Sequence, residues 1–101
     1  MRLTGLKTTA LLRASHIKPW KDASPAEKTD PYNGLLLAAH LDAAFDAGLI
    51  TFQDNGRITL SPNLSPADAL LLGIHSELRL RNVAAQHTPY LRFHRQEVFA
   101  A

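Results

Sequence analysis

The strongest constraint on the fold is the change of apolar pattern between residues 33 and 60. An Asn-Gly pair opens a short apolar run at 35–37, which reads as a buried strand or extended segment. Residues 39–46 then place apolar side chains at helical spacing, and Gly48 follows as a left-handed cap. Two further apolar runs within 49–60 are joined through a second Asn-Gly pair, a strong hairpin signal. Strand, helix and hairpin in so short a segment predict a small α+β domain.

The flanking segments add short elements to this centre. Residues 11–17 read as a strand that Pro19 stops, because proline cannot continue a ladder. Residues 21–32 read as a loop, in which Ser24 and Glu27 fit the two ends of a helical capping box.

The C-terminal half is predicted to hold two helices and one strand. A helix at 66–72 ends at Gly73, residues 78–81 alternate in strand fashion, and residues 89–98 read as a final helix. The aromatic residues expected in the core are Trp20, Phe45, Phe52 and those of the C-terminal segment.

Composition limits the class of protein. A length of 101 residues suits one compact domain. The chain has no cysteine, which excludes disulfides and thiolate zinc sites. It has neither an apolar run long enough for a membrane span nor the start of a signal peptide, so the cytoplasm is the expected compartment.

A net charge of +2 hides an uneven distribution of charge. Residues 1–21 and 78–95 carry bases and no acid, whereas residues 22–77 carry two bases against eight acids. Basic ends around an acidic centre would place phosphate-binding surface beside metal-binding carboxylates. A chance scatter of surface charge is the alternative interpretation.

Two of the five histidines stand at positions that suit chemistry. His16 lies at a strand end, and His40 begins a helix with Asp42 two residues later. An imidazole and a carboxylate this close form a half-site for a divalent cation. On their own, the same two residues also fit an ordinary helix start.

Three sequence blocks within residues 11–51 together resemble a known family. Residues 14–20 read ASHIKPW, residues 33–37 read NGLLL, and residues 40–50 follow the pattern H-x-D-x-x-F-D-x-G-L-I. In this order the blocks resemble the HNH endonucleases, and residues 90–95 give a weaker match to the tail of the same family.

The resemblance implies a ββα-metal (His-Me finger) core, in agreement with the strand, loop, strand and helix read above. The fold class expected is α+β, a single small domain in which a β-hairpin and a C-terminal helical segment complete that core. The domain is expected to span 1–101, with the motif core at 11–51 and a packing segment at 52–101.

The same resemblance assigns roles to four residues. His16 matches the general base that activates water, and Asn33 matches the amide that braces the loop around it. His40 and Asp42 fall seven and nine residues after Asn33, the positions that an acid and a histidine share in this branch. They are therefore expected to bind one divalent ion, Mg²⁺ first and Mn²⁺ or another divalent ion as the alternative.

Two departures from the family pattern stand out. Many HNH enzymes have an acidic metal ligand immediately before the catalytic histidine, and Ser15 occupies that position here. Many relatives bind a structural zinc through cysteine pairs, so none is expected in this chain.

Three basic residues are candidate phosphate or DNA contacts: Arg13, Lys18 and Lys21. Arg13 could equally pair with Asp46, which is itself expected to be structural. Histidines 75, 87 and 94 match no catalytic position of the family.

The function expected is metal-dependent hydrolysis of DNA by the catalytic domain of a bacterial restriction or defence-type protein, with RNA a less favoured substrate. A homodimer or a companion DNA-recognition domain would be its partner, and no membrane is involved. The alternative is an inactive DNA-binding or interaction module with the same fold, for which Ser15 is the argument.

Overall fold

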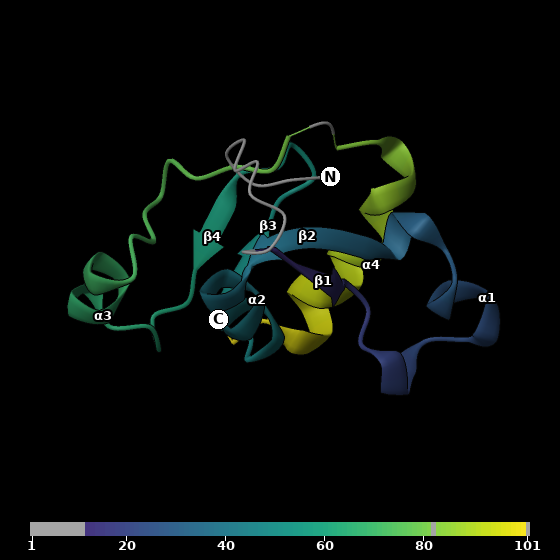
Figure 1. Cartoon of the computed structure of the whole chain (residues 1–101), viewed down its shortest axis with the longest axis horizontal. Coiled ribbons are helices and arrows are strands. Elements are labelled where there is room, and N and C mark those ends of the chain that lie inside the picture. The colour runs from purple at the N-terminus through teal and green to yellow at the C-terminus, as the bar shows by residue number, and fades with distance from the viewer. Residues whose placement is uncertain (1–11, 82, 101) are drawn as a thin grey trace.

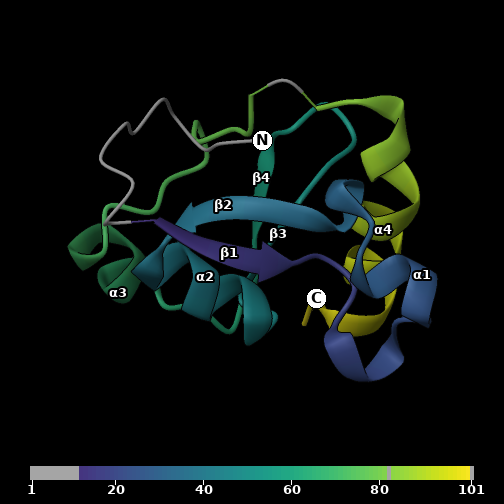
Figure 2. The same cartoon turned by 45° about the vertical axis from the view of Figure 1, so that its right-hand side comes forward.

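An antiparallel pair of strands and a helix against it form the centre of the computed structural model, which describes residues 12–81 and 83–100. Strand β1 (Leu12–His16) pairs with β2 (Gly34–Ala38), with Ser15 opposite Leu35. Helix α2 (Ala39–Asp46) follows β2 directly and lies alongside both strands (Figures 1 and 2). These three elements are the predicted ββα unit, in an α+β fold.

The segment between β1 and β2 is more ordered than the predicted loop. It contains three one-turn helices, η2 (Trp20–Asp22), α1 (Pro25–Lys28) and η3 (Pro31–Asn33). Prolines begin α1 and η3 because their fixed φ suits the first helical position. The capping box predicted at Ser24 and Glu27 is present.

The second hairpin consists of β3 (Ile50–Phe52) and β4 (Ile58–Leu60), as predicted. Helix α3 (Pro66–Leu71) follows and projects at the end of the molecule opposite α1 (Figures 1 and 2). The strand predicted at 78–81 was wrong: this segment makes only an isolated bridge between Arg79 and Arg57.

The C-terminal segment was predicted as one helix and has two parts. After η4 (Ala85–His87), helix α4 (Thr88–Phe93) continues as the π-helical turn η5 (His94–Val98). A π-helical turn adds a residue per turn and often occurs at functional sites. It redirects the end of the chain toward α2.

The core lies between the ββα unit, the β3–β4 hairpin and α4. Its fully enclosed side chains include Leu37, Phe45, Phe52 and Leu91. The rings of Phe45 and Phe52 lie 5.6 Å apart between centroids. The prediction that Trp20 belongs to this core was wrong: Trp20 is 58% exposed, because it sits on a one-turn helix outside both sheets.

Candidate active site

Two of the predicted site residues, His16 and Asp42, line a hollow of about 510 Å³ between the end of β1, helix α2 and the turn η5. We call it the β1–α2 pocket. Polar and aromatic residues from all three regions line it, among them Ser15, His16, Trp20, Asp42, Asp46 and Glu97.

His16 is the last residue of β1, so the strand places its imidazole where the ladder ends and the pocket begins. The edge of its ring meets the ring of Trp20, with centroids 5.4 Å apart and planes at 79°. Its Nε2 lies 3.4 Å from the carbonyl oxygen of Lys28. One ring nitrogen of this half-buried imidazole is thus engaged by a backbone carbonyl.

Asn33 ties together the segment that surrounds His16. Its side chain is fully buried, and its Oδ1 accepts a hydrogen bond of 2.7 Å from the backbone N–H of Lys18. Its Nδ2 donates to the carbonyl oxygens of Glu27, at 3.2 Å, and of Lys18, at 3.4 Å. One amide thus connects the start of the loop to helix α1, so it fixes the backbone on both sides of the histidine.

Two buried oxygen atoms at the pocket have no hydrogen-bond partner among the described residues. They are Oγ of Ser15 and Oδ1 of Asp42. A buried polar atom without a partner costs about 1–3 kcal/mol, and native proteins contain few of them. Their position in one pocket therefore points to a polar ligand there.

Asp46 belongs to the same pocket, although the sequence indicated a structural role. It stands one helical turn after Asp42, and residues four apart share a face of a helix. Burial raises the pKa of its carboxyl group, and the Asp42 charge raises it further, while the charge of His16 lowers it. The i, i+4 spacing of two carboxylates was the signal in the sequence that could have identified this pair.

His40 lies outside the pocket. It is exposed on α2 and does not line the hollow that Asp42 enters. Residues two apart on an α-helix point about 200° away from each other. The structure thus brings Asp42, but not His40, into the same pocket as His16.

The three predicted phosphate contacts differ in their surroundings. Lys21 is exposed and lines the pocket rim. Lys18 forms an ion pair of 3.0 Å with Glu27, and its ammonium lies 4.8 Å from the centre of the Phe93 ring. Arg13 is exposed, does not line the pocket, and donates a hydrogen bond of 3.2 Å to the carbonyl of Leu12. The first eleven residues of the basic N-terminal segment lie outside the described part of the chain.

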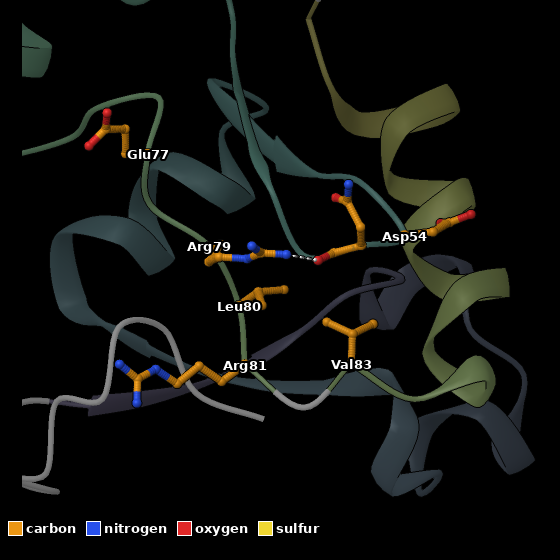
Figure 3. Close-up of a pocket in the computed structure, with 7 residues that line it drawn as sticks. Asp54, Glu77, Arg79, Leu80, Arg81 and Val83 are labelled. Atoms are coloured by element: carbon orange, nitrogen blue, oxygen red, sulfur yellow. Dashed lines mark hydrogen bonds between the residues drawn. The ribbon is translucent and has the colours of Figure 1, made fainter.

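A second hollow, of about 600 Å³, lies beside the β3–β4 hairpin (Figure 3). It is lined by Asp54, Glu77, Arg79 and four neighbours, none of them a predicted motif residue. Arg79 reaches across it to the backbone carbonyl of Asn55, at 3.0 Å (Figure 3). Arg79 is thus engaged with the protein, and Asp54 pairs with Arg95, so the β1–α2 pocket is the better candidate for chemistry.

A comparison with known protein families covers the two elements, β1 and α2, that carry His16 and Asp42. The family model described as HNH endonuclease matches residues 2–53, which include β1, β2, α2 and β3. The chain belongs to the HNH endonuclease family. No curated protein gives a significant match. Membership indicates a nuclease-type function on nucleic acid, and HNH nucleases generally use a divalent metal ion.

The donor atoms in the β1–α2 pocket fit such an ion. The pocket offers carboxylate oxygens of Asp42 and Asp46 and the unpartnered hydroxyl of Ser15, and hard cations prefer oxygen ligands. Within the described residues, no three His, Asp or Glu side chains form a complete metal-binding cluster. A hydrated divalent ion can be held by one or two carboxylates while it keeps several waters. Separately, none of the helices in the described ranges has the length and apolar character to cross a membrane.

Proposed function

We propose that this HNH chain hydrolyses phosphodiester bonds of DNA at the β1–α2 pocket, with a divalent ion and with His16 as general base. The observation that carries the proposal is that His16 and two unpartnered buried oxygens, from Ser15 and Asp42, line one hollow. A base next to vacant oxygen ligands is what metal-assisted hydrolysis of a phosphodiester requires.

His16 takes a proton from the attacking water in this proposal. The carbonyl of Lys28 can only accept a hydrogen bond, so the ring proton sits on Nε2 and leaves Nδ1 as the base. As the water oxygen bonds to phosphorus, the P–O3′ bond breaks and the leaving oxygen takes a proton from solvent. The products carry a 5′-phosphate and a 3′-hydroxyl.

Asn33 is a positioning residue in this scheme. Its three hydrogen bonds hold the backbone around Lys18 and Glu27. The segment around His16 is therefore already ordered before the substrate binds.

Asp42 is the proposed protein ligand of the ion, with Asp46 beside it. When bound, the ion stabilises the negative charge that develops on the phosphate and leaving oxygens. His40 is left out of the proposed set because its side chain is exposed outside the pocket.

DNA is proposed to approach over the rim formed by Trp20 and Lys21. Trp20 is 58% exposed, with the ammonium of Lys28 4.7 Å from the centre of its ring, and aromatic rings stack on unpaired or distorted bases. Lys21 offers an exposed ammonium to the phosphate backbone, whereas the ammonium of Lys18 is already paired. Arg13 remains a proposed contact for a phosphate further along β1. A restriction or defence role with a second copy or a companion recognition domain is part of the same proposal.

The experiment that tests this function is cleavage of supercoiled plasmid in Mg²⁺, Mn²⁺ or EDTA by wild type and by His16→Ala. Nicking that needs the metal and falls at least about a hundredfold in His16→Ala is expected, the usual size of a general-base contribution. His75→Ala is the matched control, because His75 is an exposed histidine far from the motif.

A second candidate function is a binding module that has lost activity. Ser15 favours it, since a neutral hydroxyl stands where many family members have an acid. A folded protein that binds DNA but cleaves neither plasmid nor RNA with any divalent ion would establish this alternative.

A further inference from the structure

Glu97 is an acidic residue of the β1–α2 pocket that no sequence motif identifies. It is the only acid after Glu77 in the sequence, in a segment otherwise rich in arginine. It lies on the π-helical turn η5 and lines the pocket together with Asp42 and Asp46. Its carboxylate is exposed and makes no ion pair with another described residue.

The turn that carries Glu97 is fixed against the end of α2. The backbone N–H of Ala100 donates a hydrogen bond of 2.9 Å to the carbonyl oxygen of Gly48. The backbone N–H of Phe99 donates one of 2.9 Å to the carbonyl oxygen of His94. Gly48 has a positive φ of 75°, and a Cβ built there would lie 2.2 Å from the carbonyl oxygen of Val98. The close approach requires glycine, and it places η5 directly beside the helix that bears Asp42.

The imidazole of His94 adds a buried anchor to the same turn. Its Nε2 donates to the carbonyl oxygen of Phe45, at 2.8 Å, and its ring stacks on the ring of Phe45, with centroids 3.6 Å apart. Glu97 is three residues further along, so its backbone is held by contacts on both sides.

Strand β1 contributes no acidic side chain to the pocket. Ser15 is 4% exposed, its Oγ is without a hydrogen-bond partner among the described residues, and it contributes no charge. A cation bound by Asp42 would therefore meet a neutral hydroxyl on one side. Glu97, which lines the same pocket from η5, is an acid from outside the matched residues 2–53.

We propose that Glu97 supplies the acidic partner that β1 lacks, by binding a hydrated divalent cation in the β1–α2 pocket through the cation's water ligands. This inference rests on the proposed function. A contact through water agrees with the absence, among described residues, of three acidic or histidine side chains close enough to ligate one ion directly. Outer carboxylates of this kind usually change metal affinity by about 10–100-fold.

The test is Mn²⁺ binding by isothermal titration calorimetry, which does not depend on cleavage. Glu97→Gln removes the charge and keeps the shape, and it should weaken binding about tenfold, the lower end of the outer-carboxylate range. Glu77→Gln is the matched control: Glu77 is exposed beside the other hollow, and its loss should leave the Kd unchanged. Circular dichroism confirms that each variant is folded.

Asp42→Asn separates this inference from the function on which it rests. If Asp42→Asn abolishes binding while Glu97→Gln binds Mn²⁺ as tightly as wild type, Glu97 has no such role and the proposed pocket stands. If wild type itself binds no Mn²⁺, both the pocket and the role of Glu97 are overturned. An equal loss in Glu77→Gln and Glu97→Gln would show only a general effect of net charge, and it would also overturn the assignment.

Discussion

His94 makes the stability of this protein depend on pH in a way that can be calculated from its surroundings. The ring is 1% exposed, and its burial lowers its pKa from the ordinary value of 6.5 to about 4. Nε2 must carry the proton, because it faces a carbonyl of Phe45, so Nδ1 accepts from the hydroxyl of Thr51, at 2.8 Å. The folded protein therefore requires the neutral imidazole.

The sign and size of the effect follow from linkage. Between pH 6.5 and 4 the unfolded chain holds more protons at this position than the folded one, so the free energy of unfolding falls as the pH falls. With these two pKa values, the loss relative to neutral pH is about 2 kcal/mol at pH 5 and about 3 kcal/mol at pH 4. That is a large share of the stability of a domain this small.

Urea unfolding at several pH values, followed by circular dichroism, measures this slope. His94→Gln removes the group with the larger shift and should reduce the slope between pH 7 and 4, while His87, whose pKa is also lowered by burial, keeps a smaller part of it. His75→Gln, at an exposed histidine, should keep it. An equally steep slope in His94→Gln would refute the reasoning. If that variant does not fold, an NMR titration of the wild-type imidazole replaces it, and a pKa for His94 near 6.5 would be the contrary result.

Three further substitutions or measurements follow from the contacts. Asn33→Ala should lower the free energy of unfolding by about 2–3 kcal/mol, because three hydrogen bonds of a buried amide are lost. Urea unfolding measures this loss, and a change smaller than about 1 kcal/mol, the value of a single hydrogen bond, would contradict the prediction. Gly48→Ala should cost about 2 kcal/mol or more, since φ is positive and the Cβ would meet Val98; an unchanged melting temperature would argue against the tight approach. Trp20 is the only tryptophan, so its fluorescence should change when a short DNA duplex is added in EDTA; a constant signal under conditions where DNA binds would place the DNA elsewhere.

The local elements were predictable because their signals lie within a few residues. Helix α2 begins and ends where the spacing of its apolar residues and Gly48 indicated. The capping box at Ser24 and the β3–β4 hairpin also depend on short-range patterns, and both are present. The order of motif blocks indicated the ββα unit, which the structure and the family match confirm.

The composition of the pocket was less predictable because it depends on side-chain direction and on contacts distant in sequence. Helical geometry directs Asp42 and Asp46 to one face and His40 to another, a distinction that motif spacing alone does not make. Glu97 reaches the pocket only because a π-helical turn packs on Gly48, roughly fifty residues earlier. Trp20 was expected inside from its hydrophobicity, yet the loop that carries it runs over the surface.

The most direct test of the account is chemical rescue of nicking in His16→Ala by added imidazole. Under single-turnover conditions with Mg²⁺ or Mn²⁺, His16→Ala should be slow, and imidazole should restore part of the lost rate, because it can occupy the space beside Trp20 and accept the proton of the attacking water. Asp42→Asn should gain nothing from imidazole, because its defect is a lost carboxylate rather than a lost base. A His16→Ala protein that nicks plasmid as fast as wild type, in a preparation where Asp42→Asn is equally active, would contradict the assignment of the β1–α2 pocket as the active site.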